Sequence, residues 1–154
     1  MKFYISYFYQ LRFFPTNLIP ISTAKWDPFW YKGGGVPFLD KRGVINGLRA
    51  PILNLPEESF IPDEMCGRPC TQSPPNCSFM AAYRKYLNTL DFNDIIVRAE
   101  RLANFANDNL IKTDKELEVA FMVYESKTCK CAERPVLQEW FLQNGLILPE
   151  WEKN

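Results

Sequence analysis

The chain has 154 residues, of which 47% are hydrophobic and 23% charged, as is typical of one globular domain. Lysine plus arginine equals aspartate plus glutamate at 18 each, which excludes a global electrostatic field favouring polymeric nucleic acid or an anionic membrane. Histidine is absent, which excludes Ser-His-Asp and Cys-His catalysis and histidine metal centres. We therefore expect a single domain over residues 1–154.

The first nine residues and the cysteines bear on the cellular compartment. Residues 1–9 are aromatic but contain Lys2 and Ser6, so they lack the apolar core of a signal peptide and the length of a membrane span. Five cysteines are an odd number, which argues against a disulfide framework. We expect a cytoplasmic protein whose thiols are free or bind a metal.

The first half of the chain alternates predicted strands with long loops. Phe3–Phe13 is rich in β-formers and predicts the first strand, with Arg12 near its end. Prolines and three consecutive glycines predict an ordered loop over Pro15–Pro37. Gly47–Leu55 reads as a second strand, although Pro51 favours an edge position or a bulge. A further irregular stretch follows over Pro56–Pro75.

The second half predicts two helices, a buried strand and a last helix. Helical spacing of apolar residues begins after Asn76, and a second helix follows with Asp91 or Asn93 as its N-cap. The strand covers Leu117–Tyr124 and the last helix Arg134–Asn144, with Pro135 in its first turn. Together these elements predict a three-layer α/β fold, with a small, mostly parallel sheet flanked by helices and long ordered loops.

The loop between the last strand and the last helix holds Glu125, Cys129, Cys131, Glu133 and Arg134. Ligands of α/β proteins bind where strand carboxyl ends meet helix N-termini. Arg134 and nearby N–H groups at such a place could hold a phosphate or carboxylate, whereas the alternative is an ordinary capped turn. Glu125 as general acid or base, or Cys129 as nucleophile, would serve an enzyme at this site.

The cysteines suggest zinc as the one candidate cofactor. Four thiolates can hold zinc in a tetrahedral site, and the candidate ligands are Cys66, Cys70, Cys77 and either Cys129 or Cys131. The spacing is not that of a paired Cys-x2-Cys ribbon. The alternative is that these residues are small buried hydrophobes and weakly reactive thiols.

Ile21–Tyr31 combines polar groups with aromatic rings that could stack on a planar ligand. Its polar candidates are Ser22, Thr23, Lys25 and Asp27, and Trp26 is the stacking ring. Alternatively, Trp26, Phe29 and Trp30 anchor the loop or face a protein partner. Arg12 and Arg49 could point into the same crevice as Arg134, or lie as charged residues at a sheet edge.

Three blocks carry a resemblance to a known family. ISYFYQLRFF with PISTAKWDPFWY, CGRPC with CSFMAAYRKYLNTLDF, and VYESKTCKCAERPVLQEWF together resemble domain-of-unknown-function family 488, particularly its bacterial and phage members. The resemblance spans most of the chain and implies a small α/β domain, with no activity to carry over. Many members read Cys-His-Arg where this chain has Cys131-Ala-Glu-Arg134, so a mechanism that needs the histidine is not available here.

These features favour binding of a small anionic, nucleotide-like molecule in a crevice formed by Arg12, Ser22, Lys25, Trp26 and Arg134. Aromatic rings would stack on the base, and arginine and lysine would hold the phosphates. For a phage protein, sequestration of a host nucleotide signal as a counter-defence would be a natural use. The alternative is an enzyme acting on a nucleotide or nucleoside bond through Glu125, Asp27 or Cys129, and a third possibility is a protein-interaction module.

Overall fold

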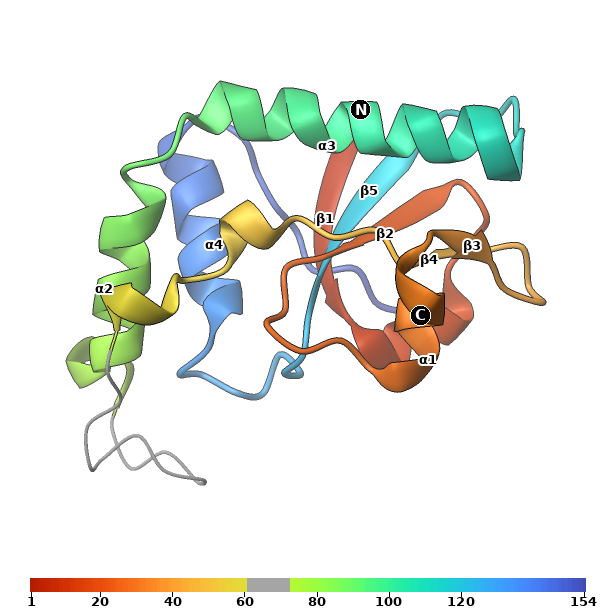
Figure 1. Cartoon of the computed structure of the whole chain (residues 1–154). Helices are drawn as coiled ribbons and strands as arrows, with labels where there is room; N and C mark the ends of the chain where they lie inside the picture. The colour runs from red at the N-terminus through yellow and green to blue at the C-terminus, as the bar shows by residue number, and fades with distance from the viewer. Residues whose placement is uncertain (61–72) are drawn as a thin grey trace.

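A three-stranded parallel sheet forms the centre of the protein in a computed structural model that describes residues 1–60 and 73–154 (Figure 1). The strand order is β1, β5, β2, with β1 over Lys2–Tyr7, β2 over Leu18–Ser22 and β5 over Glu118–Val123. A separate antiparallel pair consists of β3, Phe38–Leu39, and β4, Ile45–Asn46.

Helices and helical turns cover both faces of the sheet. The helices are α1 over Phe29–Lys32, α2 over Ser78–Leu87, α3 over Phe92–Ala106 and α4 over Glu133–Gln143. Figure 1 shows α3 crossing above the sheet, with α2 and α4 side by side at one end of the molecule. Their apolar residues form one core with the sheet face that carries Ile5, Ile21 and Phe121.

The opposite face of the sheet packs against shorter elements. A 3-10 helix over Phe8–Phe13, Tyr31 of α1 and the C-terminal Trp151 enclose Ala120 and Met122 of β5. The expected three-layer α/β architecture is therefore confirmed, and its second outer layer is made of helical turns and chain rather than long helices. No helix within residues 1–60 and 73–154 is long and apolar enough to cross a bilayer.

Both edges of the sheet are covered. Outside β1, Ile5 N–H donates to Pro149 O at 2.9 Å and Trp151 N–H donates to Ile5 O at 2.8 Å. Outside β2, Ser22 forms an isolated bridge with Arg49, in which Ser22 N–H donates to Leu48 O at 2.9 Å. These contacts satisfy backbone groups that an open edge would leave unpaired.

Two of the expected strands are wrong in position. The first strand ends at Tyr7, and Phe8–Phe13 is a 3-10 helix, so Arg12 does not lie at a strand end. The second strand is β2, Leu18–Ser22, which lies in the segment expected as a loop. A proline is tolerated on an edge strand, and Pro20 occupies one because β2 is outermost in the sheet.

The segment expected as the second strand is not one. Over Gly47–Leu55 only the Arg49 bridge to Ser22 has strand character, and Pro51–Leu53 forms a 3-10 turn. Pro51 begins that turn because its fixed φ suits a first helical position and it has no N–H to donate to a sheet.

The later elements match the expectations closely. β5 and α4 begin and end within a residue of the expected bounds, and Asp91 caps α3 by accepting a hydrogen bond from Asp94 N–H at 3.2 Å. After α3 the chain continues as one π-helical turn, Asn107–Ile111. The long apolar periodicities therefore predicted their elements well.

Candidate functional site

A cavity of about 800 Å³ opens at the carboxyl ends of β2 and β5. This is the position at which parallel α/β sheets bind ligands, because the strand ends diverge into loops there. Its size is within the usual range for ligand sites of small molecules. Its described lining residues are Ala24, Lys25, Trp26, Asp27, Leu55, Pro56, Glu57, Phe60, Phe79, Tyr124, Glu125 and Glu133.

Asp27 is the most firmly held carboxylate in this cavity. The Ser22 hydroxyl donates to Asp27 Oδ1, and Arg49 Nη1 lies 3.2 Å from Asp27 Oδ2. Arg49 Nη2 also donates to Ala24 O at 2.8 Å, which fixes the guanidinium beside the loop. Asp27 is thus neutralised and oriented, so its main effect is to shape the loop after β2.

Glu133 and Glu125 form the second acidic feature. Glu133 is the first residue of α4, and Glu125 follows the end of β5 by two residues. Burial, and next the negative charge of Glu125, raise the pKa of Glu133 to about 8. Glu133 is therefore mostly protonated at neutral pH, a state that suits a proton donor.

Thr23 is the polar neighbour of Glu133. Its hydroxyl lies 3.1 Å from Met122 O and 3.5 Å from Glu133 Oε2. One hydroxyl proton can serve only one acceptor at a time, and the nearer one is the Met122 carbonyl. The contact therefore opposes the rise in the pKa of Glu133 only weakly.

The rim of the cavity carries a cation and an exposed ring. Lys25 Nζ lies 2.7 Å from Glu57 Oε1 and 6.0 Å from the centroid of the Trp26 ring. The Lys25 and Glu57 side chains are both more than half exposed, so this ion pair contributes little to stability and can exchange partners. Trp26 is 71% exposed and offers a ring face for stacking.

Arg134 does not lie in this cavity. Its side chain is buried, with Nε 2.8 Å from Glu150 Oε2, although the N–H is not aligned for a hydrogen bond. The guanidinium also lies over the Tyr7 ring, with Cζ 5.6 Å from the centroid. The expectation that Arg134 shares a crevice with Ser22, Lys25 and Trp26 is wrong, because the C-terminal segment supplies its counter-ion.

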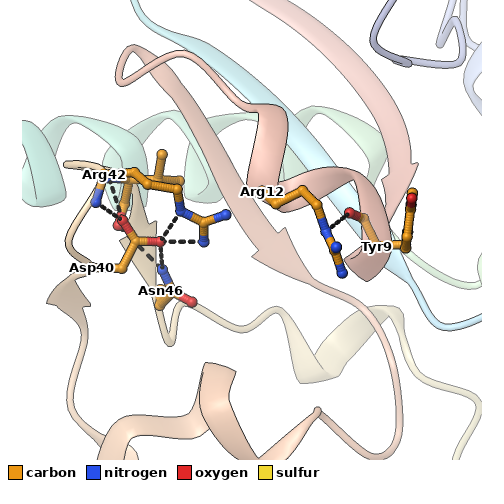
Figure 2. Close-up of polar contacts among 6 residues, drawn as sticks. Tyr9, Arg12, Asp40, Arg42 and Asn46 are labelled. Atoms are coloured by element: carbon orange, nitrogen blue, oxygen red, sulfur yellow. Dashed lines mark hydrogen bonds and ion pairs between the residues drawn. The ribbon is translucent and has the colours of Figure 1, made fainter.

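Arg12 is also outside the cavity. Its Nε donates a hydrogen bond to Tyr9 O, which Figure 2 shows. These two atoms are 3.2 Å apart, and the guanidinium lies 4.3 Å from the Tyr9 ring centroid. The 3-10 helix turns this side chain to the surface, whereas a strand would have carried it to the sheet edge. The expected position of Arg12 in the crevice is therefore wrong.

The other cluster in Figure 2 has a structural role. Asp40 accepts hydrogen bonds from the backbone N–H groups of Arg42 and Val44 and from the side chains of Arg42 and Asn46. Burial opposes ionisation of Asp40, but these hydrogen bonds prevail and hold its pKa below the ordinary value. The cluster closes the turn between β3 and β4.

The cysteines are only partly within the described residues. Cys66 and Cys70 lie outside them. Cys77 is buried, whereas Cys129 is exposed, with its Sγ 3.9 Å from Cys131 O. In the described ranges no three His, Cys, Asp or Glu residues are grouped to hold a metal ion, and zinc binding stays a prediction.

The aromatic residues of the first loop are exposed to different extents. Phe29 is 92% exposed and Trp30 49%, and the Trp30 ring packs edge-on against Phe8 at a centroid distance of 6.2 Å. Trp30 therefore partly anchors the loop, while Phe29 faces solvent. A role in binding a protein partner stays a prediction.

The structure brings several of the residues expected at a site together around one cavity. Lys25, Trp26, Asp27 and Glu125 line the cavity, while Ser22 and Thr23 lie behind it and position the carboxyl groups. Glu133 was noted only as part of the loop. Two glutamates were the available signal in the sequence. Glu125 comes just after a buried strand, and Glu133 comes at the start of the next helix.

Comparison with family models, with curated proteins and with solved structures found no match. The resemblance to domain-of-unknown-function family 488 therefore stays a prediction.

Proposed function

We propose that the protein is an enzyme that cleaves the bond between the sugar and the base of a nucleoside-like molecule, using the carboxyl groups of its cavity. The observation that supports this most is the pairing of Glu133 with Glu125 between aromatic walls. Within the described residues neither glutamate forms an ion pair, whereas Asp27 and Glu57 each have a basic partner. A protonated carboxyl group beside a second carboxyl group is what acid–base cleavage requires.

The chemistry assigns a separate role to each glutamate. Protonated Glu133 donates its proton to the departing nitrogen of the base as the carbon–nitrogen bond breaks. A water oxygen bonds to the sugar carbon, and Glu125 accepts the proton that this water loses. Protons then redistribute between the two glutamates to restore the starting state. This use of two carboxyl groups is the one that glycoside hydrolysis follows.

The cavity walls support a substrate with a planar ring and little negative charge. Trp26 and Tyr124 expose ring faces on which a base can stack. Lys25 is the one cation among the described lining residues, so a substrate phosphate would meet Lys25 at the rim. A nucleoside or a nucleotide with one outward phosphate fits this charge pattern better than a polyphosphate.

A second candidate is binding of the same class of molecule without turnover, as in sequestration of a nucleotide signal. The observation that favours it is the close placement of Lys25 and the exposed Trp26 ring, which could hold a phosphate and a base together. Such a protein would release its ligand chemically unchanged.

The test is incubation of the protein with a panel of nucleosides and nucleoside monophosphates, followed by chromatography for released base. We expect turnover that falls as the pH rises above about 8, because Glu133 then loses the proton it must donate. Glu133→Gln should reduce turnover at least about 100-fold, the range for a general acid, with binding retained. Glu116→Gln, an exposed residue away from the cavity, is the matched control.

Recovery of every compound unchanged from the wild-type protein would rule out catalysis on this panel. Calorimetric binding of one of those unchanged compounds would then establish the second candidate, while the absence of both turnover and binding would contradict both.

A further inference from the structure

A second hollow of about 470 Å³ lies on the α-helical face, between α3 and the segment after β4. Figure 1 shows this segment, coloured yellow, crossing the sheet beneath α3. Arg49, Ala50, Pro51 and Ile52 form one wall of the hollow, and the fully buried Phe121 of β5 lies at its base. We refer to this hollow as the α3 groove.

The opposite wall of the α3 groove is one face of α3. Ile95, Ala99, Leu102 and Phe105 recur there at helical spacing, and Phe105 is 56% exposed. Ligand pockets for small molecules are mostly apolar with a few placed polar groups, and this wall with Phe121 and Ile52 supplies the apolar part.

Among the described residues that line the α3 groove, the charged ones are arginines. Arg49 is held by Asp27 and the Ala24 carbonyl, and Arg98 Nε lies 2.8 Å from Asp94 Oδ2. Arg101 has no ion-pair or hydrogen-bond partner in residues 1–60 and 73–154, and no acidic residue of those ranges lines the groove. An apolar hollow with an uncommitted guanidinium is complementary to an anion that has an apolar body.

We propose that the α3 groove binds a small amphipathic carboxylate. The apolar chain lies between α3 and Pro51–Ile52 over Phe121, and the carboxylate pairs with Arg101. Arg98 stays paired with Asp94, so Arg101 supplies the charge that the carboxylate meets. This site is separate from the cavity at the carboxyl ends of β2 and β5 and does not depend on the proposed catalysis.

The test is calorimetric titration with octanoate, compared with 1-octanol, which has the same chain length but no charge. We expect octanoate to bind the wild-type protein more tightly than octanol. Arg101→Glu should weaken octanoate binding about tenfold and leave octanol binding unchanged, since one charge-assisted contact is lost. Lys85→Glu makes the same charge change at an exposed position of α2, outside the groove, and should leave both affinities unchanged.

Phe105→Ala locates the apolar part of the site. This exposed residue can be shortened without loss of the fold, and the change should weaken the binding of both octanoate and octanol. Glu133→Gln should bind octanoate as the wild type does, so a failure of the proposed catalysis does not affect this result.

The proposal would be overturned if octanoate gave no heat of binding, or if octanol bound the wild type as tightly as octanoate. It would also be overturned if Lys85→Glu lost as much octanoate affinity as Arg101→Glu. Full retention of octanoate binding in Phe105→Ala would overturn it as well.

Discussion

Replacing Glu133 with glutamine should change how the stability of the protein depends on pH. In the unfolded chain this carboxyl titrates near its ordinary value of 4.5, whereas in the folded protein its pKa is raised to about 8. Between these values the folded state holds a proton that the unfolded state has released. The wild-type protein must therefore lose stability as the pH rises through this window, and the loss is complete above about pH 8.

The size of the effect follows from the pKa difference between the folded and unfolded states. A rise from 4.5 to about 8 corresponds to at most about 5 kcal/mol of stability. The cavity is open to water, which screens the charged form, so we expect about 2–4 kcal/mol. Glutamine resembles the protonated carboxyl in shape, so Glu133→Gln should match the wild type near pH 4.5 and exceed it by this amount at pH 9.

Urea denaturation followed by tryptophan fluorescence at pH 5, 7 and 9 measures this difference directly. Glu116→Gln, at an exposed position, controls for the loss of one charge. Its free energy of unfolding should depend on pH as that of the wild type does. If the free energies of unfolding of Glu133→Gln and the wild type changed with pH in the same way, the reasoning would be refuted. Glu133 would then be ionised in the folded protein at neutral pH.

The remaining predictions concern the surroundings of the same cavity. Glu125→Gln removes the charge that opposes ionisation of Glu133, so an NMR titration should show a lower pKa for Glu133 in that variant. Asp27→Asn weakens the contacts with Ser22 and Arg49 and should cost about 1–3 kcal/mol of unfolding free energy in urea. Arg134→Ala should cost about 3 kcal/mol by the same assay, because it leaves the carboxylate of Glu150 half-buried without its counter-ion. Zinc binding by the cysteines predicts about one metal equivalent in protein purified under reducing conditions, and a metal-free product would contradict it.

The sequence around Arg134 does not determine which group its side chain contacts. Its place at the start of a helix after a buried strand was predictable, and α4 begins one residue before it. Its partner is Glu150, sixteen positions later in the numbering, which the pairing of the C-terminal segment with β1 brings beneath the helix. An anion-binding arginine and a buried structural one have the same local sequence, so only the packing of the C-terminal segment distinguishes them.

Local patterns by themselves determined α2, α3, α4, β5 and the α/β class. The apolar periodicity of α3 and the Asp91 cap are short-range features, and the continuous apolar run of β5 reflects burial on both faces. The polar residues after β2 were also recognisable, because they stand among aromatic rings that could stack on a planar ligand.

Tertiary structure alone decided the position of β2 and the grouping of the carboxyl groups. Leu18–Ser22 contains a proline and reads as a loop. It is nevertheless a strand, because an edge strand needs hydrogen bonds on one side alone and β5 provides them. Glu133 acquires its raised pKa from burial and from Glu125, and both depend on how the folded chain brings Glu125 and Glu133 to the wall of one cavity. Non-local burial of this kind has no signature in the order of residues, since it depends on which segments the folded chain brings together.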